Sequence, residues 1–338
     1  MTTKNDASFV AGDWGTTHLR LLLCASDGRI LERAAGPGAA EAGGRFAQVF
    51  QNLLAPWQQR HGALPALLCG MVGSSIGWLQ APSIPCPARS EQIAGGCVSP
   101  PDAGGHNGDG HGGSVHIVPG LSCRNRFDAP DFMRGEETQI LGAMSIDPRL
   151  RRGRQLLCLP GTHTKWALLA DGVVNEFLTA PTGELYALLR DHSVLLRERA
   201  PLEAVPGASA VEGAFDAAAF EQGLAQWNEF PHAQLLHRLF ECRARRLDGE
   251  LSAQSSPAFL SGLLIGCDIG GALRLLAETI DTPTVHLIGA PELTRLYAIG
   301  LATHDYTSTR LEGVAASVAG LAQLHAQLTR RLVTDAAR

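Results

Sequence analysis

The sequence predicts a two-domain protein of the α/β class. Its 338 residues correspond to about two domains, at roughly 150 residues each. Short apolar runs that end at glycine turns are typical of strands, and longer segments with apolar residues at helical spacing lie between them. A segment near the start of the chain also recurs in the second half. The charged stretch Asp147–Arg154 marks the expected boundary, which gives domains 1–150 and 151–338.

The internal repeat consists of two hairpins of corresponding sequence. GTTHLRLLLCASDGRILE begins at Gly15, and GTHTKWALLADGVVNEF begins at Gly161. Each copy predicts a Gly-Thr turn, an apolar strand, an Asp-Gly turn and a second strand, and Asp-Gly between apolar runs is a strong hairpin signal. We therefore expect the two halves of the chain to begin alike. The alternative is a chance similarity between two hairpin stretches.

The Gly-Thr turns are candidate phosphate-binding loops. Glycine allows backbone N–H groups to approach an anion closely, and threonine hydroxyls add further donors. Two such loops that face each other across a cleft would hold a polyphosphate from both sides, whereas the structural alternative is a pair of ordinary surface hairpins. The candidate phosphate contacts are Gly15, Thr16, Thr17 and Arg20 in the first half and Gly161, Thr162, His163 and Lys165 in the second.

Asp13 precedes the first of these loops. A carboxylate beside phosphate groups is repulsive unless a cation lies between them, and Mg²⁺ prefers oxygen ligands. We therefore expect Asp13 to hold Mg²⁺, either directly or through a bound water.

Composition narrows the class of partners. Hydrophobic residues make up 45% of the chain and charged residues 18%, which is typical of a soluble globular protein with sizeable cores. The formal net charge of -5 gives no electrostatic basis for nucleic-acid binding. The longest uncharged stretch, residues 62–88, is interrupted by prolines and glycines, so it is a poor membrane span. We expect neither nucleic acid nor a membrane as a partner.

The cysteines and the first residues indicate the compartment. The chain begins MTTKNDAS, which is polar and precedes no apolar signal-peptide core. The eight cysteines form no CxxC pair, and several lie inside apolar runs, where a buried reduced thiol is expected: Cys24, Cys69, Cys158 and Cys267. We therefore expect a cytoplasmic protein.

Six segments in chain order resemble the 2-dehydro-3-deoxygalactonokinase family: DWGTTHLR, GMVGSSIGW, MRGEETQILGA, LPGTHTKW, TGELYALL and FLSGLLIG. The duplicated hairpins resemble the wider superfamily of sugar kinases, heat-shock ATPases and actin. The resemblance implies a duplicated ribonuclease H-like (actin-like ATPase) fold with the active site in the interdomain cleft. It also implies ATP-dependent, Mg²⁺-assisted phosphorylation of the terminal hydroxyl of 2-dehydro-3-deoxy-D-galactonate. Residues 95–116 resemble an insertion, and about the last 50 residues match only loosely.

Glu136 and Glu137 are the candidate catalytic residues. They follow Gly135 at the start of a helix that is expected to end near Ile146. Acidic residues in a first helical turn complement the helix dipole, which is the structural interpretation. The functional interpretation is that one carboxylate accepts the proton of the substrate hydroxyl. The resemblance places the superfamily's catalytic acid at such a helix start and favours Glu137, since Thr138 follows it; the choice between the two glutamates stays open.

The expected sugar-acid pocket combines a glycine-rich loop with Arg134. The loop follows a buried strand and carries Ser74, Ser75 and Trp78, at the end of a strand where α/β proteins bind ligands. A structural loop with a packed tryptophan is the alternative. Arg134 would either bind a substrate carboxylate in bidentate fashion or neutralise Glu136.

The resemblance extends the site to two segments of the second half. Thr182 is expected to cap a helix, and the resemblance places Glu184, in that helix, beside the cleft where it meets substrate hydroxyls. The segment TVHLIGAPELTRLYAIGL predicts a strand, a turn at Gly289 and a helix, which the resemblance associates with adenosine binding.

The remaining helices and one histidine-rich loop complete the prediction. An amphipathic helix is expected from Phe46 to about Gln59, and an apolar helix with glycine packing positions begins near FLSGLLIG. A final helix could pack back on the N-terminal domain. His106, His111 and His116 belong to a glycine-rich tract that favours a surface loop over a fixed metal site.

The expected partners are ATP and a small sugar acid, and the sequence is compatible with a homodimer. Two other functions stay open. One is a kinase for another sugar or sugar acid, which would differ only around the Ser74–Trp78 loop and Arg134. The other is a non-catalytic nucleotide- or sugar-binding regulator on the same fold.

Overall fold

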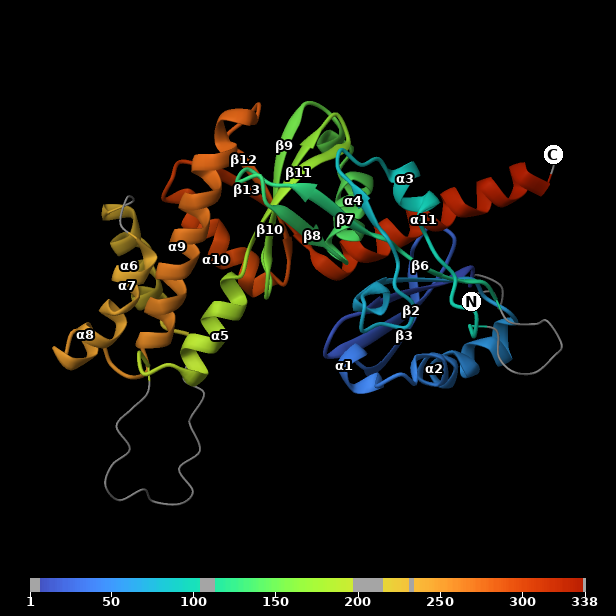
Figure 1. Cartoon of the computed structure of the whole chain (residues 1–338), viewed down its shortest axis with the longest axis horizontal. Helices are drawn as coiled ribbons and strands as arrows, with labels where there is room; N and C mark the ends of the chain where they lie inside the picture. Colours follow the sequence, from blue (N-terminus) through green and yellow to red (C-terminus); the bar gives the residue numbers. More distant parts are fainter. Residues whose placement is uncertain (1–6, 104–112, 197–214, 231–233, 337–338) are drawn as a thin grey trace, which may run out of the picture. The chain divides into compact units, whose positions relative to one another are not determined.

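The structure, a computed structural model, describes residues 7–103, 113–196, 215–230 and 234–336 (Figure 1). Its first five-stranded sheet has the order β3-β2-β1-β4-β6. β1 pairs antiparallel to β2 and parallel to β4. The strands are β1 (Phe9–Trp14), β2 (His18–Cys24), β3 (Ile30–Pro37), β4 (Ala66–Gly70) and β6 (Val115–Ile117).

A second five-stranded sheet repeats this arrangement. Its order is β11-β10-β9-β12-β13, so the third, second, first, fourth and fifth strands, counted along the chain within each sheet, lie in the same succession. The strands are β9 (Arg154–Leu159), β10 (Thr164–Ala170), β11 (Val173–Ala180), β12 (Thr284–Gly289) and β13 (Thr307–Glu312). The duplication expected from the two hairpin sequences is confirmed, and the fold is the duplicated ribonuclease H-like fold of actin-like ATPases.

The predicted Asp-Gly turn of the second half closes the β10–β11 hairpin. Asp171 and Gly172 have φ angles of 48° and 75°, and two consecutive positive φ angles are the property of a type I′ turn. A third, three-stranded sheet has the order β5-β7-β8, with β5 at Ser83–Pro85, β7 at Gly120–Arg124 and β8 at Pro130–Met133.

The helices lie between and after these strands. The predicted amphipathic helix is α2, which ends at His61 rather than near Gln59, and the predicted acidic helix is α4 (Glu136–Ile146). The helices are α1 (Ala39–Ala42), α2 (Phe46–His61), α3 (Ser90–Gly95), α4, α5 (Thr182–His192), α6 (Ala217–Glu229), α7 (Leu235–Leu239), α8 (Glu241–Leu247), α9 (Ser256–Leu276), α10 (Pro291–Ala302) and α11 (Gly313–Ala336), with short 3-10 turns at Met71–Gly73, Pro148–Arg151 and Ala277–Thr279.

The chain divides into two compact units. Unit 1 comprises Met1–Leu157, Ala167–Leu178 and Leu311–Arg338, and unit 2 comprises Cys158–Trp166 and Thr179–Arg310. The final helix α11 is therefore part of unit 1. The domain boundaries expected from the sequence, 1–150 and 151–338, stay a prediction.

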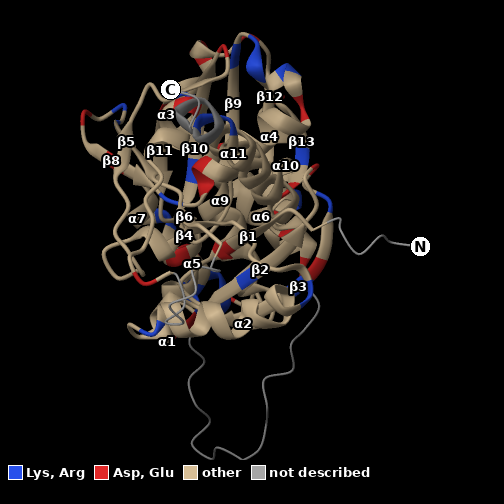
Figure 2. Cartoon of the chain, turned by 90° about the vertical axis from the view of Figure 1, so that its right-hand side faces the viewer, with Lys and Arg blue, Asp and Glu red and all other residues tan. Residues whose placement is uncertain are grey.

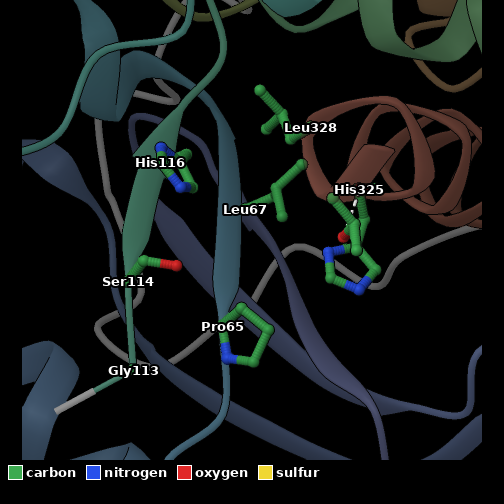
Figure 3. A pocket seen from close by; sticks show the side chains of 8 residues that line it. Pro65, Leu67, Gly113, Ser114, His116, His325 and Leu328 are labelled. Atoms are coloured by element: carbon green, nitrogen blue, oxygen red, sulfur yellow. Dashed lines mark hydrogen bonds between the residues drawn. The ribbon is translucent and has the colours of Figure 1, made fainter. Parts of the chain in front are cut away.

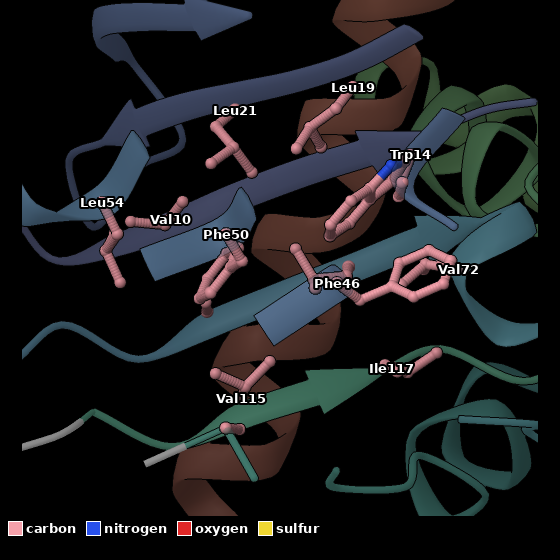
Figure 4. Close-up of a cluster of buried hydrophobic side chains, with 14 of the residues drawn as sticks. Val10, Trp14, Leu19, Leu21, Phe46, Phe50, Leu54, Val72, Val115 and Ile117 are labelled. Atoms are coloured by element: carbon pink, nitrogen blue, oxygen red, sulfur yellow. The ribbon is translucent and has the colours of Figure 1, made fainter. Parts of the chain in front are cut away.

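The core of unit 1 lies between the first sheet and α2 (Figure 4). Residues at helical spacing form the buried face of α2: Phe46, Phe50, Leu54 and Trp57. Trp14, at the end of β1, has no exposed surface, and its indole N–H donates to the carbonyl of Pro37 at 3.1 Å. This packing fixes the end of β1, which carries Asp13.

Helix α11 packs against α4 in unit 1 through close backbone contacts. A Cβ atom at Gly142 would lie 1.7 Å from the carbonyl oxygen of Ala316, and one at Gly320 would lie 2.0 Å from that of Thr138. Any larger residue at these positions would separate the helices. The ring of His325 in α11 also stacks on Phe9, with centroids 4.7 Å apart.

Helix α9 is a core helix of unit 2. Among the described residues it belongs to the one helical stretch that is long and apolar enough to cross a membrane, Ser256–Thr279, and 72% of that apolar window is buried inside the protein. A Cβ at Gly262 would lie 2.0 Å from the carbonyl oxygen of Phe220 in α6. The glycine acts as a packing position, as predicted.

Candidate active site

The first candidate phosphate loop is the turn between β1 and β2. The N–H of Gly15 donates to the carbonyl of His18 at 2.9 Å, and Thr16 and Thr17 are exposed. The carbonyls of Gly15 and Thr16 accept hydrogen bonds from the first turn of α1, at 2.9 and 3.1 Å. The loop is therefore held by its carbonyl groups, and its threonine side chains remain at the surface.

Asp13 lies two residues before this loop, on β1. The strand register places it opposite Arg20 on β2 and Cys69 on β4. Its carboxylate is 32% exposed and lies 3.8 Å from the guanidinium of Arg20. Burial raises the pKa of Asp13, and the positive charge of Arg20 offsets part of this rise. The carboxylate is thus only partly compensated by the protein's own charges.

Two glycines bring the start of α4 beside Asp13. Gly70 and Gly135 have φ angles of 89° and 107°, a region that favours glycine. A Cβ at Gly70 would lie 2.9 Å from the carbonyl oxygen of Trp14 and 3.3 Å from Oδ1 of Asp13. A Cβ at Gly135 would lie 3.4 Å from the Cα of Gly70. The turn before α4 therefore packs directly on the end of β4, next to Asp13.

Glu137 is completely buried in this junction. Its Oε2 accepts from the N–H of Gly135 at 2.6 Å, and its Oε1 accepts from the hydroxyl of Thr138 at 2.9 Å. Burial, followed by the neighbouring charge of Glu136, raises the pKa of Glu137 to about 8. A carboxyl group with such a shift is typical of functional sites, although structural networks also produce it.

The other predicted residues of this junction lie nearby. Glu136 is partly buried, and its Oε2 accepts from the backbone N–H of Arg134 at 3.0 Å. The charges of both Asp13 and Glu137 help to raise the pKa of the buried Cys69 thiol, after burial itself. The structure therefore brings Asp13, Glu136 and Glu137 together at one end of the first sheet.

The chemistry of this junction fits a single magnesium ion. Among the residues that the structure describes, no group of three His, Cys, Asp or Glu side chains could enclose a metal. Mg²⁺ in phosphoryl-transfer sites is held by one or two carboxylates, substrate phosphates and water rather than by an all-protein cage. The partly exposed, partly compensated carboxylate of Asp13 meets that requirement.

Arg134 reaches from the same junction to the glycine-rich loop after β4. Its Nη2 donates to the carbonyl of Ala81 at 2.9 Å. Its Nη1 is buried and has no hydrogen-bond partner among the described residues, and a Cβ at Gly73 would lie 2.8 Å from it. The guanidinium therefore lies against the start of the Ser74–Trp78 loop.

Within that loop the predicted residues have different environments. The hydroxyl of Ser74 donates to the carbonyl of Met71 at 2.8 Å, and Ser75 is exposed. The indole of Trp78 packs on Phe50 and Trp14, with ring centroids 5.6 and 6.3 Å away, and its N–H donates to Asp102 at 2.8 Å. Trp78 thus has the packed environment of the structural alternative, whereas Ser75 is accessible.

The second candidate phosphate loop, Gly161–His163, is fastened to the start of α5. The N–H of Glu184 donates to the carbonyl of Thr162 at 2.9 Å, and the carboxylate of Glu184 lies 2.8 Å from Nε2 of His163. A Cβ at Gly183 would lie 2.3 Å from the carbonyl oxygen of Gly161. Loop and helix start therefore form one structural piece in unit 2.

The predicted roles of Lys165 and Thr182 in this region have different outcomes. Lys165 is only 5% exposed, and its Nζ donates to the hydroxyl of Thr179 at 2.8 Å, so its contact with a phosphate stays a prediction. The prediction that Thr182 caps α5 is wrong. Pro181 occupies the cap position without a side-chain cap, and the Thr182 hydroxyl donates to Asp268 instead, because a buried carboxylate is the stronger acceptor.

Comparison with known proteins identifies the family. The model of the 2-keto-3-deoxy-galactonokinase family matches residues 13–324. The chain belongs to this family. A probable 2-dehydro-3-deoxygalactonokinase of Rhizobium meliloti is 36% identical over 317 residues, which cover 93% of this chain and 95% of that protein. The 2-dehydro-3-deoxygalactonokinase of Escherichia coli is 31% identical over 316 residues, with coverage of 93% and 96%.

This member of the 2-keto-3-deoxy-galactonokinase family is similar to a solved structure over nearly its whole length. A Sinorhizobium meliloti protein assigned as a 2-dehydro-3-deoxygalactonokinase has a TM-score of 0.78 and 34% sequence identity. The similarity covers 94% of this chain and 97% of that one. The family expected from the six sequence segments is therefore confirmed.

In this family member Gly289 lies close to the second candidate phosphate loop. The predicted strand, turn and helix are β12, Gly289–Ala290 and α10. A Cβ at Gly289 would lie 3.3 Å from the carbonyl oxygen of Pro160, the residue before Gly161. The turn and the loop are thus neighbours within unit 2.

The sequence prediction missed a buried acidic residue, Asp268, in α9. Its carboxylate accepts hydrogen bonds from Trp166, Thr182 and Tyr297, at 2.8, 2.7 and 2.5 Å. The available signal was a lone carboxylate within a 21-residue helix in which Arg274, near the end, is the other charged residue.

A cavity of about 280 Å³ in unit 1 contains none of the predicted site residues (Figure 3). His116 and His325 line it, together with Pro65, Leu67, Gly113, Ser114, Leu328 and Thr329. Burial lowers the pKa of both histidines. The other two histidines of the predicted surface loop, His106 and His111, lie outside the described residues.

Proposed function

We propose that this chain is an ATP-dependent 2-dehydro-3-deoxygalactonokinase. It transfers a phosphate to the terminal hydroxyl of 2-dehydro-3-deoxy-D-galactonate, forms the 6-phosphate and serves galactonate degradation. The observation that carries the proposal is the buried Glu137 carboxyl, with a pKa of about 8, beside Asp13 in a chain of this kinase family. Phosphoryl transfer needs positioning, charge neutralisation and a base for the attacking hydroxyl, and these two carboxylates suit the last two requirements.

Asp13 and the two Gly-Thr loops are the proposed binding groups for metal and phosphate. Mg²⁺, when bound, neutralises part of the charge on the phosphates. Asp13 would hold it, directly or through water, because its carboxylate is partly exposed and Arg20 compensates its charge in part. The proposed phosphate and nucleotide contacts are Gly15, Thr16, Thr17, Arg20, Gly161, Thr162, His163, Lys165 and Gly289.

Glu137 is the proposed base. The N–H of Gly135 and the hydroxyl of Thr138 orient its carboxylate, and a pKa near the operating pH suits proton transfer. Because the side chain has no exposed surface, a substrate hydroxyl reaches it only after a shift at the turn before α4. Glu136, which is partly exposed in the same turn, is the alternative.

Arg134 is the proposed contact for the carboxylate of the sugar acid. Its Nη1 has no hydrogen-bond partner in the described structure, and an unpaired buried donor is costly unless a ligand or water satisfies it. The Ser74–Trp78 loop lies against this guanidinium. We propose Ser74, Ser75, Trp78 and Glu184 as further substrate contacts.

We propose the cytoplasm as the location, since all eight cysteines are free thiols. The proposed partners are ATP and a sugar acid, without nucleic acid or membrane. In Figure 2 the positions of acidic and basic residues are interspersed along the chain. A homodimer also stays a proposal.

A coupled assay of ADP release with ATP, Mg²⁺ and a panel of sugar acids tests the function. We expect the highest kcat/KM with 2-dehydro-3-deoxy-D-galactonate. A higher value with another sugar or sugar acid would change the substrate, and binding without turnover on every member of the panel would favour the regulator.

A further inference from the structure

The carboxylate of Asp268 is the centre of a buried hydrogen-bond network in unit 2. Its Oδ1 accepts from the indole N–H of Trp166 at 2.8 Å, and its Oδ2 accepts from the hydroxyls of Thr182 and Tyr297 at 2.7 and 2.5 Å. The hydroxyl of Tyr297 also lies 2.9 Å from that of Thr164. Asp268 is 9% exposed, and burial raises its pKa while these hydrogen bonds lower it.

The donors come from three elements that begin at the second phosphate loop or beside it. Thr164 and Trp166 are the first and third residues of β10, directly after the loop Gly161–His163. Thr182 is the first residue of α5, whose second residue, Gly183, packs on the loop. Tyr297 lies in α10, which follows the Gly289 turn.

Burial of a carboxylate in this position has an unfavourable desolvation free energy. Apart from Ser256, the rest of α9 packs in the core through apolar residues and glycines, and an apolar side chain at position 268 would avoid the loss of hydration of a charge. In this position, however, the carboxylate is a common acceptor for hydrogen-bond donors on β10, α5 and α10. Such a hub fixes the relative positions of the elements that carry the loop.

We infer that Asp268 is a positioning residue for nucleotide binding, because it fixes the loop Gly161–His163 and the Gly289 turn relative to each other. This inference rests on the proposed function of that loop. Asp268 itself touches no substrate; it acts through the donors that it holds. Loss of one donor should therefore weaken binding of MgATP more than binding of the sugar acid.

Two isosteric substitutions remove one donor each. Thr182→Val and Tyr297→Phe keep the packing and delete a hydroxyl, and Thr182→Ser restores a hydroxyl at the same place. Ser256→Ala is the matched control, because it deletes a buried hydroxyl in α9, the helix that carries Asp268. The Ser256 hydroxyl donates to the carbonyl of Ser252 at 2.6 Å rather than to Asp268. Circular dichroism and thermal unfolding of the full chain verify that each variant folds.

Calorimetric titration with MgATP and steady-state kinetics give the readouts. Because each substitution removes a hydrogen bond to a charged group, we expect Thr182→Val and Tyr297→Phe to weaken MgATP binding roughly tenfold. We expect Thr182→Ser and Ser256→Ala to stay within about twofold of wild type, and Tyr297→Phe to change the KM for the sugar acid by less than about twofold.

Equal loss of MgATP affinity in Ser256→Ala and Tyr297→Phe would overturn the inference, because it would indicate general destabilisation. Unchanged MgATP affinity in both Thr182→Val and Tyr297→Phe would overturn it as well. Failure of the proposed function has a different signature. In that case wild type releases no ADP with any sugar acid, while the calorimetric comparison of the variants still measures nucleotide binding.

Discussion

Replacement of Glu137 by glutamine perturbs the candidate site most directly. Glutamine has nearly the same shape, and its carbonyl oxygen can still accept a hydrogen bond, but the amide cannot accept the proton of a substrate hydroxyl. General base catalysis contributes about 10²–10⁴-fold to turnover. We expect Glu137→Gln to lose turnover by a factor in this range, while it still binds ATP and the sugar acid.

The pKa of Glu137 gives this prediction a second signature. A carboxyl group with a pKa of about 8 is roughly one-tenth ionised at pH 7. If the ionised form is the active base, kcat of wild type rises about tenfold between pH 7 and the plateau, which begins about one pH unit above this pKa. We expect this rise to disappear in Glu137→Gln.

The same shift predicts the pH dependence of stability. The folded-state pKa of about 8 lies above the ordinary value of 4.5, so the folded protein binds more protons than the unfolded chain between these values. The free energy of unfolding therefore falls as the pH rises from about 4.5 to about 8. Urea unfolding of Glu137→Gln should lack this part of the pH dependence.

Glu136→Gln is the matched control for turnover and for its pH profile. Both are measured by ADP release at saturating ATP and sugar acid. We expect it to have the milder effect on turnover. A severe loss in Glu136→Gln with nearly normal turnover in Glu137→Gln would assign the base to Glu136. Nearly normal rates in both variants would refute the reasoning, because the base would then lie elsewhere in the chain.

Three further predictions concern the same unit. Asp13→Asn should reduce turnover strongly and weaken its dependence on Mg²⁺, because a ligand charge beside the phosphates is lost; an unchanged Mg²⁺ titration would contradict this role. A substrate analogue with an alcohol in place of the carboxylate should bind worse by roughly 2–5 kcal/mol, because the donors of Arg134 lose a charged partner; equal kcat/KM for acid and alcohol would exclude the carboxylate contact. Gly70→Ala should lower the free energy of unfolding in urea by about 1–2 kcal/mol or more, since φ is 89° and the new Cβ meets the carbonyl of Trp14; Gly44→Ala, also at positive φ but without neighbouring atoms within 4 Å, shows how much of the loss comes from that contact.

Features that depend on neighbouring residues could be predicted from the sequence. The Asp-Gly turns and the amphipathic face of α2 follow from local conformational preferences and from the helical period, and α4 begins at Glu136 as expected. The duplicated sheet order follows from the hairpin repeat.

Features that depend on partners far along the chain could not be predicted in the same way. Thr182 has the local character of a helix cap, yet its hydroxyl bonds to Asp268, 86 residues away. The orientation of Trp78 depends on Trp14 and Phe50, which no local pattern connects to it. The burial of Glu137 depends on Gly70 and Gly135, whose special backbone angles only the folded junction explains.

The place of α11 in unit 1 has a consequence for biosynthesis. Helix α4, which carries Glu136 and Glu137, packs on the last helix of the chain through glycine contacts. Both segments of unit 2, Cys158–Trp166 and Thr179–Arg310, are encoded between the main part of unit 1, Met1–Leu157, and α11. Because a ribosome makes α11 after all of these segments, the candidate catalytic helix of the nascent chain lacks this support until α11 has been made. An N-terminal fragment that stops before Leu311 should therefore have no independent kinase activity, and phosphate transfer should begin only once α11 has been made and has packed on α4.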